Sequence, residues 1–438
     1  MSRNLRSARL DSPRSNGNNS GPGTPRSIRD SGNSLKVSGP PTAVASEKND
    51  DDDGNDEPSL EQGHFFDLQG NVRDAYGYVV PEALQLNYMQ WRIRTAPEAQ
   101  KRGELFAHIN DSPRFAYFDT DIQTLFKEGV PTHLRRPMWL QITGVGARIA
   151  NNRGRYAALL ARAEQDKSSK FYKDRTAIEL DMERTFGENS KLNTAETVAK
   201  LRNVMLAYAK HNREFGYAQS MNFIVSALLL VNLTEEEAFW MFDYLMSMMP
   251  NCYDREFSGV VADIEVLDYY MEAKLKKLHE FLQTHRVDKE MYLTQMFMCL
   301  YVGYVPYETM LCLWDRIMYG GIVELFRSAL KFLNFIQAKI VVKKGADSVT
   351  IADAIISEHQ ALINPHEALA LMPGSQPLEA GQLQFRRMRY REINKMKKRE
   401  MRELTQISSR PADAEQSSNS IADIDELSVD DTNINQEK

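Results

Sequence analysis

The sequence predicts an all-α protein, and three observations support that prediction. Apolar residues recur at helical spacing over most of residues 82–342, and no stretch shows the sustained alternation of a strand. Capping residues, Gly and Pro separate these apolar stripes at short intervals. Residues 1–60 and 405–438 contain no aromatic residue, so they lack the apolar groups that offset the entropy of ordering. We therefore expect a multi-helix body between disordered N- and C-terminal tails.

Composition and helix pattern divide the chain into five segments. The first is rich in Ser, Gly and Asn and then acidic, and the last is acidic. Between them we expect a helical lead-in that packs on a main helical domain, followed by C-terminal helices ending in a basic one. The expected ranges are 1–60, 61–128, 129–345, 346–404 and 405–438.

The net charge of −6 averages unlike segments. Residues 47–57 carry seven acidic groups and one lysine, and the tail from Thr405 carries eight acidic groups against Arg410 and Lys438. Without these segments the body is near neutral, so nothing supports a nucleic-acid-binding domain.

Targeting and redox signals are weak. The three cysteines are widely spaced and form no Cys-x-x-Cys or Cys/His cluster, which is typical of reduced, buried thiols in a cytoplasmic protein. The longest apolar run, 223–233, is too short to span a bilayer. The Arg- and Ser-rich start also fits a mitochondrial transit peptide, but Asn, Gly and Pro interrupt a helix there. We favour a disordered tail whose Ser12-Pro13 and Thr24-Pro25 are phosphorylated to alter a partner contact, the alternative being a plain linker.

The first expected helices lie at 82–105 and after Pro131. An apolar stripe then recurs at helical spacing from 134 to 149. Trp139 lies beside that stripe and is expected to anchor the core. Arg135 is one turn earlier on the same face, so we expect it to stack on Trp139 or to form a buried ion pair.

Two helix starts have clear capping residues. Asn193, with Glu196 three residues later, is expected to cap a helix that Gly216 ends. Thr234 with Glu237 forms a capping box for a helix that Pro250 ends. Further helices are expected at 221–231, 263–282, 289–303, 307–318 and 323–342.

The basic segment 384–404 holds nine Lys or Arg and three Glu. Its apolar residues are spaced irregularly, so any apolar stripe drifts around the helix. We expect a solvated C-terminal helix; the alternative is a helix that binds a membrane surface or an acidic partner.

Residues 178–222 hold the candidate functional groups. Arg184 is expected where one helix ends, and Gln219 in the loop before another begins, so both can be presented by loops on a rigid scaffold. The chain has no G-x-S-x-G, H-E-x-x-H or phosphate-binding-loop motif, so assistance to another protein's reaction is the candidate chemistry.

In GTP hydrolysis a guanidinium stabilises the phosphate charge, and a glutamine amide positions water. From spacing alone, we favour an Asp181–Arg184 surface ion pair and an ordinary loop glutamine over two catalytic side chains.

Three motifs in order resemble the TBC family, the GTPase-activating proteins for Rab GTPases. R-x-x-x-W matches residues 135–139, I-x-x-D-x-x-R matches 178–184, and Y-x-Q matches 217–219. The flanks Gly129-Val130-Pro131 and Leu313-Trp314-Asp315 also resemble the family. The resemblance covers about 129–342, roughly half of the chain.

This resemblance implies an all-helical TBC domain, at 129–345, that binds a GTP-loaded Rab and regulates vesicle trafficking. The protein would be an enzyme activator without a cofactor of its own, acting on Rab-bound GTP and Mg, cytoplasmic and peripheral on endomembranes. Arg184 would be an arginine finger and Gln219 a glutamine finger that replaces the Rab's own glutamine. The other motif residues would support them: Asp181, Tyr217 and Asn222 near the fingers, and Arg135 and Trp139 mainly in structure.

Two departures from the family pattern bear on activity. Ser220 replaces the usual glycine after Gln219. If that position requires positive φ, serine is strained; if it caps the next helix, serine suits it, and we expect the cap. Gly187 replaces a common proline. The alternative function is therefore a catalytically weak TBC module that binds a Rab as an effector or scaffold, and a third alternative is an unrelated helical scaffold.

Overall fold

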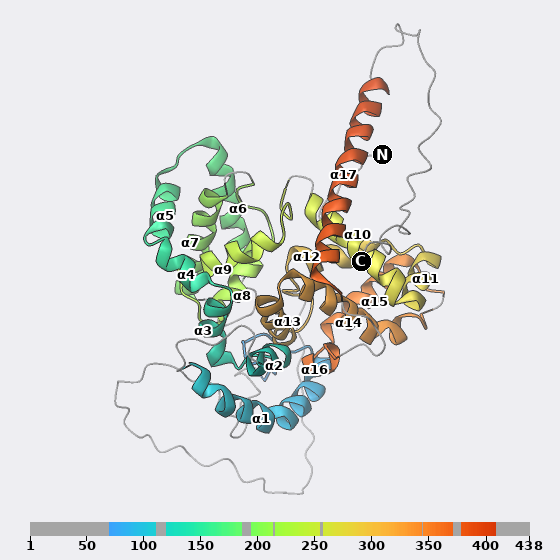
Figure 1. Ribbon diagram of the computed structural model, residues 1–438, viewed down its shortest axis with the longest axis horizontal. Helices are drawn as coiled ribbons and strands as arrows, with labels where there is room; N and C mark the ends of the chain where they lie inside the picture. The colour runs from blue at the N-terminus through green and yellow to red at the C-terminus, as the bar shows by residue number, and fades with distance from the viewer. Residues whose placement is uncertain are drawn as a thin grey trace, which may run out of the picture. The chain divides into compact units, whose positions relative to one another are not determined.

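The computed structural model describes residues 70–110, 120–185, 194–212, 215–254, 257–343, 345–370 and 378–408. Within these ranges the chain forms seventeen α-helices, and its β-structure is confined to an isolated bridge between Arg73 and Val79 (Figure 1). The all-α prediction is confirmed. The two tails expected to be disordered lie outside the described residues, except that 405–408 continue the last helix.

The helices follow one another with short connections in most places. Their bounds are α1 Glu82–Asn110, α2 Thr120–Glu128, α3 Thr132–Ile142, α4 Val145–Asn151, α5 Arg155–Gln165, α6 Ser169–Thr185, α7 Ala195–His211, α8 Met221–Leu230, α9 Glu235–Met248, α10 Ser258–Lys274, α11 Lys276–Thr284, α12 Lys289–Met298, α13 Tyr307–Gly320, α14 Ile322–Ile340, α15 Ser348–Gln360, α16 Pro365–Ala368 and α17 Ala380–Ser408.

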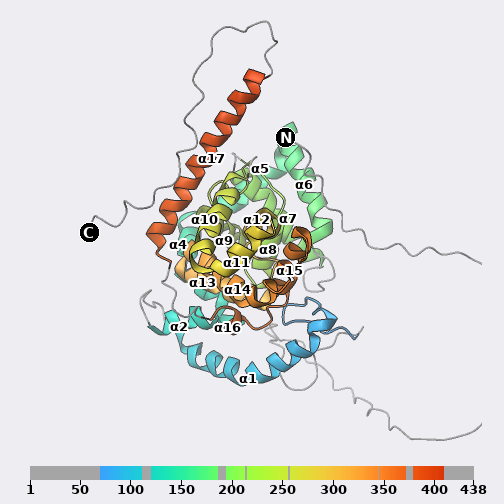
Figure 2. The same cartoon turned by 90° about the vertical axis from the view of Figure 1, so that its right-hand side faces the viewer.

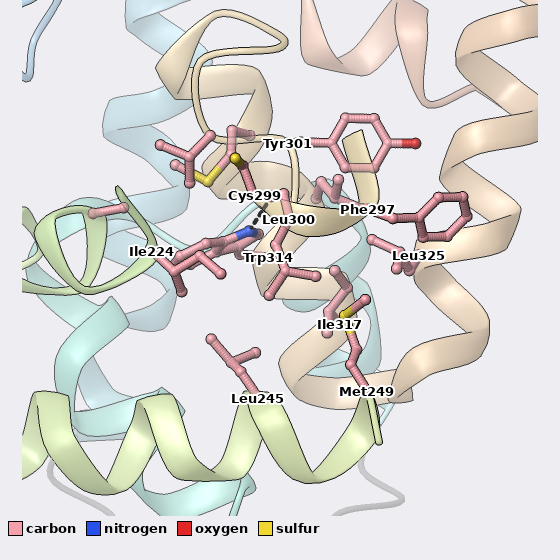
Figure 3. Close-up of a cluster of buried hydrophobic side chains, with 14 of the residues drawn as sticks. Ile224, Leu245, Met249, Phe297, Cys299, Leu300, Tyr301, Trp314, Ile317 and Leu325 are labelled. Atoms are coloured by element: carbon pink, nitrogen blue, oxygen red, sulfur yellow. Dashed lines mark hydrogen bonds between the residues drawn. The ribbon is translucent and has the colours of Figure 1, made fainter. Parts of the chain in front are cut away.

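One hydrophobic core unites most of these helices, with Trp314 of α13 near its middle (Figure 3). The Trp314 ring is fully buried, and its indole Nε1 donates a hydrogen bond of 2.9 Å to the Leu300 carbonyl. Leu300 and Tyr301 both have positive φ, so the chain turns sharply after α12. That turn ends α12 at Met298, five residues before the end expected from the sequence.

Two apolar stripes that are continuous in the sequence each fall on two separate helices in the structure. The expected helix over 134–149 is two helices, α3 and α4, because Gly144 between them has φ of +71°. The expected helix over 263–282 breaks at Leu275 into α10 and α11. A hydrophobic stripe continues across such breaks because both pieces face the same core, so periodicity does not reveal them.

Two capping predictions had different outcomes. The Thr234–Glu237 capping box of α9 is present with both of its hydrogen bonds. Helix α7 is instead capped by Thr194, whose side chain accepts from the Thr197 N–H, and Asn193 lies outside the described residues. The helix also ends at His211, five residues before Gly216.

The lead-in and the C-terminal helices both pack on the main domain. Helix α1 contacts α3, and its Arg92 forms a 3.0 Å ion pair with Glu308 of α13. Helix α17 packs on α10, where Arg387 and Asp263 form a buried ion pair. Its C-terminal half continues past the helices on which it packs (Figures 1 and 2). The expectation of a fully solvated C-terminal helix is therefore wrong for its first half.

Candidate functional site

The first candidate residue, Arg184, lies in the last turn of α6, where the sequence predicts it. The Thr185 hydroxyl donates to the Asp181 carbonyl at 2.5 Å and so satisfies a carbonyl of the final turn. The Arg184 side chain lies outside what the structure describes, as does Gly187. The end of α6 therefore fixes the backbone of Arg184, which lies one residue before Thr185, where the described segment stops, and three residues after Asp181.

The second candidate residue, Gln219, lies in the loop that joins α7 to α8 and is exposed. The loop turns at Gly216, which has φ of +69°. A Cβ atom at this position would lie 2.6 Å from a carboxylate oxygen of Asp174, so both backbone conformation and space require glycine. Burial raises the pKa of Asp174, while the hydrogen bond from the Tyr217 backbone opposes that rise.

Two side-chain hydrogen bonds join the end of α6 to this loop. The Tyr217 hydroxyl donates to Asp181 Oδ2 at 2.5 Å, and Asn222 Nδ2 donates to Thr185 Oγ1 at 2.6 Å. Asp181 and Asn222 are almost fully buried, so little solvent competes with these bonds. Thr185 directly follows Arg184, and Tyr217 and Asn222 flank Gln219. The two bonds therefore hold the starting points of both candidate side chains beside each other.

Ser220 does not act as the side-chain cap expected from the sequence. It stands immediately before α8, but its φ is +87° and its side chain makes no capping hydrogen bond. The Ser220 N–H instead donates to Asn222 Oδ1 at 3.1 Å, and the Ser220 side chain lies beside the Cys299 thiol, where it opposes the rise in that thiol's pKa. The position thus requires the left-handed conformation that glycine adopts without strain. We expected a capping serine and not one with positive φ, and that expectation is wrong.

The R-x-x-x-W motif forms a separate, buried network around Asp315 of α13. Arg135 donates to both Asp315 oxygens at 3.1–3.3 Å, and Trp139 Nε1 donates to Oδ1 at 2.8 Å. The Val130 N–H donates to Oδ2 at 2.8 Å. The Asp315 and Trp139 side chains are fully buried. Of the two roles expected for Arg135, the structure has the buried ion pair.

The lead-in segment completes this network. Arg135 Nη1 donates to the Tyr76 hydroxyl at 2.6 Å, and burial raises the pKa of Tyr76 to about 12. Gly129 has φ of +101°, and a Cβ there would lie 2.9 Å from the sulfur of Cys312. Asp315 therefore fixes the start of α3 against α13 and the lead-in, and no member of the network lies in the loop that carries Gln219.

Several residues of the site were missed from the sequence. Thr185 holds the end of α6, and Asp174 holds the α7–α8 loop that carries Gln219, which we call the finger loop. In the sequence each resembles an ordinary polar residue of a helix. Asp174 and Asp181 are seven residues apart and therefore share a helix face, which was an available signal. In the sequence, Asp315 is distinguished only by its place in the segment Leu313-Trp314-Asp315, which resembles the family. Its partners are about 180 residues away in sequence, so no local pattern reveals them.

The described residues give little support for a metal site, a membrane-spanning helix or reactive thiols. They contain no group of His, Cys, Asp and Glu suited to a metal ion. None of the helices that can be described is long and apolar enough to cross a membrane. The three cysteines are free, and burial raises the pKa of the Cys299 and Cys312 thiols to about 11.

Comparisons with known proteins agree with this fold. The sequence-family model of the Rab-GTPase-TBC domain matches residues 132–341. Growth hormone-regulated TBC protein 1 of Xenopus laevis is 29% identical over 273 residues, covering 61% of this chain and 78% of that protein. Growth hormone-regulated TBC protein 1-A of Danio rerio is 30% identical over 285 residues, covering 64% of this chain and 76% of that protein.

Two solved structures share the architecture. The Chlamydomonas flagellar RabGAP TBC domain superposes with a TM-score of 0.59 at 25% identity, covering 68% of this chain and 96% of that one. The Ypt/Rab-GAP domain of Gyp1p superposes with a TM-score of 0.55 at 14% identity, covering 68% of this chain and 99% of that one, which shows the fold alone.

The helical body is a TBC domain, which is a GTPase-activating domain. The chain belongs to the Rab-GTPase-TBC family. Membership excludes the third alternative, an unrelated helical scaffold, and implies a Rab GTPase as partner.

Proposed function

We propose that this protein accelerates GTP hydrolysis by a Rab-family GTPase with two side chains supplied in trans. Arg184 stabilises the charge that develops on the phosphate oxygens, and Gln219 orients the attacking water. The protein is thus an enzyme activator in membrane traffic. It acts on GTP and Mg bound to the Rab, without a cofactor of its own, in the cytoplasm and at endomembrane surfaces.

The observation that supports this most is the pair of bonds between the end of α6 and the α7–α8 loop. The bonds from Tyr217 to Asp181 and from Asn222 to Thr185 join the backbone segments that carry Arg184 and Gln219, and this supports the proposal. Catalytic groups need such fixed starting points, because small misplacements cost large factors in rate. Gln219 is exposed, as a group that must enter a partner's active site has to be.

The alternative is a TBC module that binds a Rab without activating it. The positive φ of Ser220 favours this alternative, because backbone strain next to Gln219 alters how the loop presents the amide. One measurement distinguishes activation from binding alone: the effect of substituting Arg184 or Gln219 on the rate of GTP hydrolysis.

The test is single-turnover GTP hydrolysis over a panel of Rab proteins with wild type, Arg184→Ala and Gln219→Ala. We expect wild type to accelerate at least one Rab and Arg184→Ala to lose about 10³-fold or more of that acceleration. A Rab whose own water-positioning glutamine is replaced by alanine should still be accelerated, because Gln219 takes over that task.

Arg202→Ala is the matched control, because Arg202 is a half-exposed arginine on α7 paired with Glu179 of α6. It should leave the rate unchanged. Acceleration that survives Arg184→Ala would exclude the arginine finger. Rab binding without any acceleration by wild type would establish the non-catalytic alternative. The phospho-dependent partner predicted at the N-terminal tail falls on residues that the structure does not describe and stays a prediction.

A further inference from the structure

Three cations gather where α13 and α14 meet α2 and α16. Arg316 belongs to α13, and Arg327 and Lys331 belong to α14; we call these three residues the cation cluster. Helix α13 contacts α2, α14 and α16, and the four helices lie side by side in both views (Figures 1 and 2). All three side chains are partly buried and partly exposed. Their charges are therefore poorly solvated, yet a ligand can reach them.

Two of these cations share one neutral acceptor. Arg316 Nη1 donates to the Leu369 carbonyl at 3.1 Å, and Lys331 Nζ donates to the same oxygen at 3.0 Å. Their charges therefore lie no more than about 6 Å apart and repel each other. Arg316 Nη2 has a second backbone acceptor, the Lys127 carbonyl at 2.6 Å. Within the described ranges, neither Arg316 nor Lys331 forms an ion pair with a carboxylate.

The carboxylates near the cation cluster already have cationic partners. Glu324 is paired with Arg327 at 2.5 Å. Asp315 is paired with Arg135 in the buried network described above. The sequence of residues 371–377, which follows α16, contains neither Asp nor Glu. The cation cluster thus has more positive charge than the described residues around it neutralise.

The pKa values of two cations reflect this excess of positive charge. Burial lowers the pKa of Arg316. Burial and the neighbouring Arg316 lower the pKa of Lys331 to about 8, and Arg327 and Lys127 lower it further than Glu324 alone would allow. Each of these causes disfavours the protonated amine. A bound anion acts in the opposite direction, because an opposite charge favours the charged form of a cation.

The cation cluster also has more hydrogen-bond donors than acceptors. Lys331 has three ammonium protons and uses one of them on the Leu369 carbonyl, and each Nη atom of Arg316 has a second proton. The buried Nε atoms of Arg316 and Arg327 have no hydrogen-bond partner. A phosphate group supplies several strong acceptor oxygens and close to two negative charges. Its charge and its acceptors both match what the cluster lacks.

We propose that the cation cluster is a binding site for a phosphate-class anion, which Arg316, Arg327 and Lys331 hold together. Free phosphate and a phosphate-bearing lipid headgroup share this chemistry. The inference does not rest on the proposed function, because none of these residues lies in the finger loop or at the end of α6. The anion neutralises the junction of α13, α14 and α16 and so stabilises it.

A purely structural role explains the cluster less well. In that role Arg316 and Lys331 fasten the Leu369 carbonyl after α16, and Lys331→Met destabilises the protein because one donor is lost. If the cluster serves an anion, Lys331→Met removes an uncompensated, partly buried charge. Without phosphate the variant is then at least as stable as wild type. The two roles therefore predict different signs for one measurement.

The test measures thermal unfolding of the full chain in chloride buffer and in inorganic phosphate at the same ionic strength. Lys331→Met and Arg316→Gln/Lys331→Met change the cation cluster. Lys339→Met is the matched control, because Lys339 lies on the same helix and pairs with Glu358 at 2.6 Å on the surface. Phosphate stabilises most proteins slightly through its exclusion from their surfaces. The shift that the double variant retains measures this general effect.

We expect phosphate to raise the Tm of wild type by about 2–4 °C more than that of the double variant, because a ligand that binds only the folded state stabilises it. Lys339→Met should respond to phosphate as wild type does. In chloride buffer, Lys331→Met should melt no lower than wild type. Equal phosphate shifts in wild type and the double variant would overturn the proposal, as would a lower Tm of Lys331→Met in chloride. If the double variant does not fold, Lys331→Met provides the same comparison with phosphate.

Vesicles distinguish the two sources of the phosphate group. Wild type and the double variant are sedimented with phosphatidylcholine vesicles that contain phosphatidic acid or, at equal charge, phosphatidylserine. Binding that prefers phosphatidic acid and is lost in the double variant would support the site with a lipid headgroup as its ligand. A phosphate-dependent rise in Tm without such vesicle binding would support the site with a free phosphate compound as its ligand.

The acidic segment of the chain itself is the competing occupant. Residues 47–57 carry seven acidic groups, among them four consecutive aspartates at 50–53. A full-length variant with all four changed to asparagine tests this competitor in the same phosphate titration. If phosphate stabilises this variant but not wild type, the acidic segment occupies the cation cluster and the proposal is overturned. If both respond equally, the segment has no part in the site.

Discussion

The network around Asp315 contains the R-x-x-x-W motif and the loop that carries Gln219 contains the Y-x-Q motif, yet the two regions are built in opposite ways. Around Asp315 every polar group points inward and is buried, and one carboxylate accepts from an arginine, a tryptophan and a backbone N–H. At the finger loop the buried bonds form a base, and Gln219 is left exposed above it.

The comparison separates motifs that define a fold from motifs that display a side chain. The Asp315 network joins α3, α13 and the lead-in, so its loss affects the whole domain. The finger loop contains a glycine with no room for a Cβ and a serine with positive φ, features that are costly for stability. Such features persist where they position a functional group. Substitutions in the two regions should therefore affect different measurements.

The largest effect on stability is expected from Asp315→Ala. The substitution leaves the Arg135 guanidinium buried without its carboxylate, which costs about 3–5 kcal/mol. Chemical denaturation followed by circular dichroism measures this loss. Arg136→Ala is the control, because the adjacent arginine pairs with Glu237 at the surface and its loss should cost less than about 1 kcal/mol. Similar values for the two variants would mean that the Asp315 network is not what holds α3 in place.

A smaller effect, mainly on rate, is expected from Tyr217→Phe. Removing the hydroxyl deprives Asp181 Oδ2 of a buried donor, at a cost of about 1–3 kcal/mol in stability. It also loosens the link between α6 and the finger loop. We expect the maximal GTPase-activating rate to fall about tenfold, equivalent to about 1.4 kcal/mol, with little change in Rab affinity.

Tyr172→Phe serves as the control for this prediction, since Tyr172 is on α6, the helix that carries Asp181, and is largely exposed. It should change neither quantity. A Tyr217→Phe protein that is less stable but fully active would show that the bond to Asp181 supports the fold and does not position the fingers.

The sequence predicted those features that depend on local spacing. It placed Arg184 at a helix end and Gln219 in a loop before a helix, and it found the Thr234–Glu237 capping box, because each depends on residues a few positions apart. It missed the break at Leu275 and the end of α12 at Met298, because the apolar pattern continues across both turns.

Features set by distant parts of the chain could not be predicted in this way. The side of α17 that is buried depends on Asp263, which is 124 residues earlier. The conformation of Ser220 depends on the loop held by Asp181 and Thr185 and on Cys299 beneath it. Serine is acceptable both as a helix cap and, at some cost, with positive φ, so its identity alone does not decide between them.

The smallest effect is expected from Ser220→Gly, and it tests whether the finger loop stores backbone strain. Glycine adopts φ of +87° without the steric cost that serine has, but it loses the hydroxyl beside the Cys299 thiol and has more freedom when unfolded. We expect a net gain of about 0.5–1 kcal/mol, measured as a rise of roughly 1–4 °C in Tm. The GTPase-activating rate should change by no more than about twofold, since the hydrogen bonds that hold the loop are retained.

Ser220→Ala separates the two contributions, because it keeps the strain and removes only the hydroxyl. The expected order of stability is therefore glycine, then serine, then alanine. If the glycine variant melts below wild type, the contribution of the serine hydroxyl outweighs the strain, and the left-handed serine is a favourable part of the loop. If the glycine variant is also much more active than wild type, the strain at Ser220 limits how Gln219 is presented, which would bring the protein closer to the weakly catalytic alternative.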